Sequence, residues 1–75
     1  NPITTINFSV SQNNAPIKIV VHDLKGNQVG VLLNENYEVG RHQMQWNASD
    51  FSSGIYFVVF DAGGVREIQK VTVLK

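Results

Sequence analysis

Apolar and polar residues alternate along most of this chain, and short clusters of turn-forming residues separate the alternating segments. Near the start, Ile6, Phe8 and Val10 alternate with Asn7 and Ser9. Successive side chains of a β-strand point to opposite faces, so this pattern predicts strands that bury one face. No segment has the apolar spacing of an amphipathic helix. The sequence therefore predicts an all-β fold.

The same pattern predicts further strands at residues 17–22, 29–33, 40–46, 54–61 and 65–75. The expected inward-facing side chains are Ile17, Ile19 and Val21, then Val29, Val31 and Leu33, and then His42, Met44 and Trp46. Residues 54–61 are apolar on both faces, which predicts a central strand. Six or seven strands with short turns indicate an immunoglobulin-like antiparallel β-sandwich.

Two connections have specific expected roles. Asp23 begins a hairpin turn in which Gly26 takes a positive φ at low steric cost. The polar connector 47–53 contains Phe51, which we expect to plug one end of the core. These positions predict where the chain turns and how one end of the sandwich is closed.

Composition excludes several classes of function. Six basic and six acidic residues give zero formal charge, whereas nucleic acids and anionic membranes require clustered Lys and Arg. Without cysteine the chain forms no disulfide and no thiolate metal site. No apolar run approaches the roughly 20 residues that span a bilayer. We expect no nucleic-acid partner, no membrane-spanning segment and no cofactor.

The 75 residues correspond to one small domain, residues 1–75. The chain begins at Asn1-Pro2 without an initiator methionine, which indicates a fragment of a longer precursor. Terminal segments fray unless a sheet holds them. The strand expected at residues 65–75 therefore suggests a structured C-terminus that another molecule reads.

No combination of residues predicts catalysis. A carboxylate can orient a histidine base, but His22 and Asp23 are adjacent on a strand and point to opposite faces. A metal site shared by His22 and His42 lacks positioned carboxylates, and we favour His42 near a sheet edge with its ring on the core. The serines of the 47–53 connector lack the Gly-x-Ser-x-Gly turn of hydrolases. The sequence predicts a protein that is not an enzyme.

Trp46 has two interpretations. An exposed Trp46, together with Tyr37 or Tyr56, could stack on sugar rings as in a carbohydrate-binding module. The interpretation that we favour is a central core residue, because a small sandwich commonly fills its core with one Trp.

Several short motifs follow one another along nearly the whole chain. They are Asn1-Pro2 with Thr5–Phe8, Ile17–Asp23 with Gly26 and Val29, Gly40-Arg41-His42, Trp46-Asn47, Ser53–Phe57 and Lys70–Lys75. In this order they resemble the type A C-terminal sorting domain of the type IX secretion system of Bacteroidetes and related phyla. The chain departs from the family pattern at His22, where a Tyr is common, and in its connector 47–50, which is less rich in glycine.

The resemblance implies a sorting signal at the C-terminus of a secreted enzyme or adhesin. Such domains direct a covalently linked N-terminal cargo from the periplasm through the outer-membrane translocon to the cell surface or the medium. A sortase-like peptidase of the attachment complex then usually removes them. The residues expected to contact the translocon are Lys70, Val71, Thr72, Val73, Leu74 and Lys75. The residues expected to define the fold are Asp23, Gly26, Gly40, Trp46, Gly54 and Tyr56.

Two alternatives stay open beside this interpretation. One is the carbohydrate-binding module. The other is an inert spacer or assembly module, similar to the immunoglobulin-like module of the flagellar hook-capping protein. Exposed strand edges also offer unpaired backbone groups, which permit β-augmentation by a translocon component or dimerisation through strand edges.

Overall fold

The computed structural model describes residues 3–75, so the expected role of Asn1-Pro2 as the start of the domain lies outside the described residues. The strands are β1 (Ile3–Val10), β2 (Ala15–His22), β3 (Gln28–Tyr37), β4 (Gly40–Asn47), β5 (Gly54–Ala62) and β6 (Val65–Val73). Within residues 3–75 no helix is long and apolar enough to cross a membrane. The prediction of an all-β fold is confirmed.

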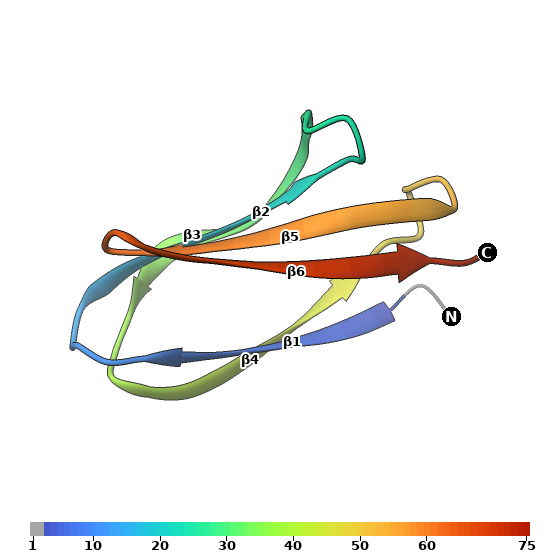
Figure 1. Ribbon diagram of the computed structural model, residues 1–75. Coiled ribbons are helices and arrows are strands. Elements are labelled where there is room, and N and C mark those ends of the chain that lie inside the picture. Colours follow the sequence, from blue (N-terminus) through green and yellow to red (C-terminus); the bar gives the residue numbers. More distant parts are fainter. Residues whose placement is uncertain (1–2) are drawn as a thin grey trace.

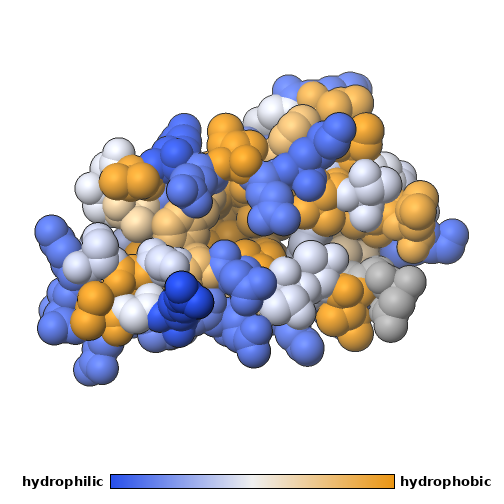
Figure 2. Space-filling view, turned by 60° about the horizontal axis from the view of Figure 1, so that its bottom comes forward, coloured by the Kyte–Doolittle hydropathy of each residue, from blue (hydrophilic) through white to orange (hydrophobic). Residues whose placement is uncertain are grey.

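The six strands form two antiparallel sheets, which Figure 1 shows as two layers. One sheet contains β1 and β4, and the other has the order β3-β2-β5-β6. This arrangement corresponds to strands B and E of one immunoglobulin sheet and to C′, C, F and G of the other. The prediction of an immunoglobulin-like sandwich is therefore confirmed, with six strands. Figure 2 turns the β1–β4 layer forward, and hydrophilic side chains predominate there.

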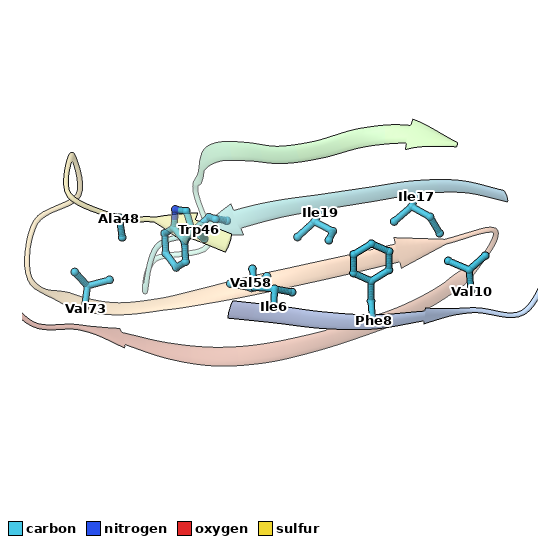
Figure 3. Packing of buried hydrophobic residues seen from close by; sticks show 10 residues of the cluster. Ile6, Phe8, Val10, Ile17, Ile19, Trp46, Ala48, Val58 and Val73 are labelled. Carbon is cyan, nitrogen blue, oxygen red and sulfur yellow. The ribbon is translucent and has the colours of Figure 1, made fainter. Parts of the chain in front are cut away.

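The core lies between the two sheets and receives side chains from both (Figure 3). Its buried members are Ile6, Phe8, Val10, Ile17, Ile19, Val21, Trp46, Ala48, Val58 and Val73. The alternation predicted for β1, β2 and β4 is confirmed by this set. β5 lies between β2 and β6, so its predicted central position in the sheet is confirmed as well.

The inward face predicted for β3 is right for Leu33 and wrong for Val29, Val31 and Leu32. Val29 and Val31 are exposed, while Leu32 and Leu33 both pack against the core. The pairing of β2 with β3 shifts register at two points, so Leu32 and Val29 of β3 have no partner residue on β2. A β-bulge inserts one residue and reverses the alternation beyond it, so a strict period of two cannot describe this strand.

The turns have the backbone conformations that the sequence indicates. Asp23 accepts hydrogen bonds from the backbone N–H groups of Lys25 at 3.0 Å and Asn27 at 2.9 Å, and Gly26 has φ +91°. Gly63 and Gly64, with φ of +56° and +93°, join β5 to β6 in a two-residue turn. Positive φ at both positions is the requirement of a tight type I′ hairpin.

Candidate functional site

The last strand, β6, lies at the edge of the four-stranded sheet. It pairs with β5 along its whole length, from Val65 opposite Ala62 to Val73 opposite Gly54. Its other edge has no neighbouring strand among the described residues. An edge strand presents a row of backbone N–H and C=O groups to which another chain can add. β6 can therefore accept a further strand without any change in the sandwich.

The segment Lys70–Lys75 does not form a single contact surface. Val71 packs against the core and Val73 is 3% exposed within it. Lys70 and Thr72 lie on the opposite, outer face of the sheet, opposite Phe57 and Ile55 of β5. The pleat therefore divides the predicted recognition residues into an inward pair, which holds the strand, and an outward pair, which a partner can contact.

The strand ends two residues earlier than the predicted range of 65–75. β6 stops at Val73 because β5 begins at its partner, Gly54. Leu74 is 72% exposed. The backbone N–H of Lys75 donates to the Ser53 hydroxyl at 3.0 Å, and the Lys75 ammonium group donates to the Ser49 carbonyl. The segment after β6 is thus held by the connector 47–53.

The same connector is also held by contacts between aromatic rings. The Phe51 ring lies edge-on to Trp46 and to Tyr56, with centroids 5.3 Å apart in both pairs. The Tyr56 hydroxyl donates to the Ser52 carbonyl at 2.8 Å, in the arrangement of the tyrosine corner of immunoglobulin domains. A Cβ at Gly30 would lie 3.3 Å from the Phe51 ring. The prediction that Phe51 plugs this end of the core is confirmed.

The other residues expected to define the fold lie in turns and at strand starts. Gly40 is the first residue of β4 and pairs with Val10, and Gly54 is the first residue of β5. The hydrogen bond from the Asn27 backbone N–H is the main reason that the pKa of the Asp23 carboxyl lies below its usual value of 3.8. This carboxylate is committed to its turn, as the sequence predicts.

The structure does not bring the two histidines together. His22 is on β2, and His42 is on β4 in the other sheet. The His42 ring stacks on Phe8 with a centroid distance of 5.5 Å, and its Nε2 lies 2.8 Å from the Glu38 carbonyl oxygen. The prediction that His42 rests its ring on the core is confirmed. Among residues 3–75, no three His, Asp or Glu side chains are grouped to hold a metal ion.

Trp46 has no face available for a sugar ring. It is 3% exposed and belongs to the core, as favoured from the sequence. Tyr37 packs on Phe8 and His42, and burial, followed by its contact with Glu35, raises the pKa of its hydroxyl. The glycan-binding alternative thus loses Trp46, the aromatic residue on which it depended most.

A groove of about 780 Å³ is lined by residues of both sheets near the β1–β2 and β5–β6 turns. These turns lie at the opposite end of the sandwich from the C-terminus (Figure 1). The lining of the groove includes Phe8, Phe60, Arg41 and Glu67, and Val65 at the start of β6. The groove exists because the two-stranded sheet is narrower than the sheet that it faces. It leaves the first part of β6 uncovered on the inner side.

Sequence reasoning missed Ser49 and Ser53 as partners of Lys75, and treated them as ordinary turn residues. Their contacts join positions 22 and 26 residues apart along the chain. Only the β5–β6 register could have indicated them, because a pair between Gly54 and Val73 places Ser53 near the residues after Val73.

Comparison with known proteins gives one result that covers the chain. The family described as "Secretion system C-terminal sorting domain" matches residues 1–74. No curated protein and no solved structure matches the chain.

Proposed function

Because the chain belongs to the family of secretion system C-terminal sorting domains, we propose that the type IX translocon recognises the segment Lys70–Lys75, which contains the end of β6 and the two residues after it. Membership in the family makes the domain a signal for type IX secretion, which directs export across the outer membrane to the cell surface or the extracellular space. The family is in general non-catalytic. The proposal assigns the contact with the secretion machinery to one strand of the sandwich.

The proposal includes the precursor and its processing. The chain is the single C-terminal domain of a larger secreted protein, whose N-terminal cargo is covalently linked to it. After export, a sortase-like peptidase of the attachment complex removes the domain. Neither step requires chemistry from the domain itself.

The observation that carries the proposal is the position of β6. It is an edge strand whose outer backbone edge pairs with no other strand of residues 3–75, and Ser53 and Ser49 hold the residues after it in place. Strand addition to an edge of this kind obtains affinity from main-chain hydrogen bonds and specificity from alternate side chains. A strand fixed before binding also costs less conformational entropy when the partner docks.

The test is a reporter protein fused to the N-terminus of the domain and expressed in a host with a type IX system. Deletion of Lys70–Lys75 should abolish surface display. Because the deletion also removes the core residue Val73, a second variant replaces only exposed residues, with Lys70→Ser and Leu74→Ser. This variant should keep the fold, checked by the resistance of the domain to protease, and should reduce display. Normal display by the deleted fusion would refute the proposal.

A further inference from the structure

An apolar row crosses the outer face of the four-stranded sheet, on the side away from the core. The pairing places Val31 opposite Val20, Val20 opposite Val59, and Val59 opposite Ile68. We name these four residues the outer stripe. With strands about 4.8 Å apart, the stripe is about 14 Å long. It has one residue on every strand of the sheet.

The outer stripe continues into the residues assigned to recognition. Phe57 and Ile55 lie beyond Val59 on the same face of β5, and they pair with Lys70 and Thr72. The ends of the stripe are open, since Val31 is 53% and Ile68 is 62% exposed. The outward residues of the last strand are therefore one side of a larger, partly apolar face.

The same face carries positively charged residues on both sides of the outer stripe. Lys18, Arg66 and Lys70 lie on it, and Asp61 is its acidic residue, so the strands give the face a net charge of +2 in a chain of zero net charge. Arg66 forms with Asp61 the only ion pair found in residues 3–75, at 3.5 Å. Lys18 lies in the row of residues on one side of the outer stripe, and Lys70 lies in the row on the other side. These two rows are four residues apart along the strands, which is about 13 Å at 3.3 Å per residue.

From this arrangement we infer that the outer face of the four-stranded sheet is a docking surface for a protein whose apolar ridge carries carboxylate groups on both sides. The inference rests on the proposed function and enlarges its recognition site from one strand to a sheet face. The ridge covers the outer stripe, and the carboxylates pair with Lys18 and Lys70. The exposed apolar residues of this face are Val31 and Ile68 at the ends of the stripe and Ile55 beside it, while Val20 and Val59 between the ends are 8% and 6% exposed. Exposed apolar residues with a polar rim are typical of interaction sites on soluble proteins.

Charge complementarity selects this occupant over two others. A second copy of the chain would bring Lys18 and Lys70 against another face of net charge +2, and like charges across an interface oppose binding. An anionic membrane attracts clusters of basic residues, but here Asp61 lies in the same row as Lys18. A protein can place one carboxylate at Lys70 and another on the side of Lys18 away from Asp61, which a uniformly anionic surface cannot do.

The first experiment uses the same reporter fusion and two pairs of exposed apolar residues. Val31→Ser with Ile68→Ser changes both ends of the outer stripe. Leu24→Ser with Val39→Ser is the matched control, because both residues are exposed and lie in turns. We expect the stripe variant to lower surface display at least tenfold and the control to stay within twofold of the unchanged domain, with equal protease resistance.

The second experiment reverses charges. Lys18→Glu with Lys70→Glu should also lower display at least tenfold, whereas Lys25→Glu with Arg41→Glu, the same change in charge off the face, should not. A photo-crosslinking residue in place of Ile68, but not of Gln43, should form an adduct with an outer-membrane component of the secretion machinery.

The outcomes separate this inference from the proposed function. If deletion of Lys70–Lys75 abolishes display while the stripe and charge variants export normally, the docking face is wrong and the role of β6 stands. If the deletion has no effect, the proposed function fails first. Dimerisation through Ile68 in sedimentation, or binding to phosphatidylglycerol vesicles that Lys18→Glu with Lys70→Glu removes, would overturn the assignment of a protein partner.

Discussion

The outer faces of the two sheets differ in how many apolar residues they carry. On the sheet of β1 and β4, the outward side chains are polar except for Ile3 at the start of β1; the polar ones are Thr5, Asn7, Ser9, Arg41, Gln43, Gln45 and Asn47. On the other sheet, the outer stripe and its neighbours Phe57 and Ile55 are apolar. An antiparallel sheet that faces water normally alternates apolar inward and polar outward residues. The two-stranded sheet follows this rule more closely, because the outer face of the four-stranded sheet combines the apolar stripe with polar residues such as Lys18 and Lys70.

The difference teaches that the outer stripe is not needed to close the sandwich. Both sheets contribute inward side chains to one core, and the mostly polar outer face of β1 and β4 shows that a sheet of this domain can lie in water with a single apolar residue, Ile3, on it. Selection for the fold alone therefore does not explain Ile68 and Val31, which stay more than half exposed. Their position beside Lys70 connects the difference to export.

The largest expected effect comes from the core that both faces share. Trp46→Ala should lower the free energy of unfolding by about 3–5 kcal/mol, because a buried indole leaves a large cavity. This loss approaches the whole stability of a small domain. Urea unfolding followed by far-ultraviolet circular dichroism measures it, with Trp46→Phe as the milder control. A loss below about 1 kcal/mol would contradict the buried position of Trp46.

The next prediction compares how much a central residue of each outer face contributes to stability. Val59 is 6% exposed although it lies on the outer side of the sheet. Val59→Ala removes two methyl groups and should cost about 1.5 kcal/mol, whereas Gln43→Ala on the polar face should change stability by about 0.5 kcal/mol or less. Urea unfolding of both variants tests this. Equal costs would mean that the outer stripe adds nothing to the packing of its sheet.

The sequence predicted the strands more reliably than the faces. Alternation placed the core residues of β1, β2 and β4, because each of these strands keeps a strict period of two. The prediction of the inward face of β3 failed in part because the bulges of this strand depend on its register with β2, which is a long-range property. β5 was predicted as central from its two apolar faces, but the sequence could not show that its outer face has no covering layer.

The candidate site shows the same limit. The motif Lys70–Lys75 could be read from the sequence, but its division into inward Val73 and outward Lys70 required the pairing with β5. The anchors on Ser53 and Ser49 depended on the position of the connector, which aromatic packing on Phe51 determines. Local patterns therefore predicted which segment matters, and tertiary contacts decided how it is presented.

A smaller effect is expected at the ends of the outer stripe. Val31→Thr with Ile68→Thr keeps β-branched side chains in strands and should change the free energy of unfolding by about 0.5 kcal/mol or less. The same variant should elute earlier from a hydrophobic-interaction column than the unchanged domain, since the patch becomes polar. Leu24→Thr is the control for loss of an exposed apolar residue outside the sheet. Unchanged retention would show that the stripe is not an accessible apolar surface.

The smallest expected effect concerns Asp23, in the turn between β2 and β3. Its pKa lies below 3.8 in the folded chain, chiefly because the Asn27 backbone N–H donates to its carboxylate. Because the folded pKa is below the unfolded value, the turn contributes stability above the unfolded pKa and loses it as the pH falls through the folded pKa.

An NMR titration of the Asp23 carboxyl carbon should give a midpoint below 3.8. Asp23→Asn keeps an acceptor oxygen for the Lys25 and Asn27 N–H groups and should remove the acid-dependent part of the turn's stability. Since the turn lies outside both outer faces, amide signals of Gln43 and Val59 should not follow this titration. A midpoint at or above 3.8 would contradict the effect of the turn hydrogen bonds on Asp23, and a parallel change at Val59 would show that the turn and the apolar face are coupled.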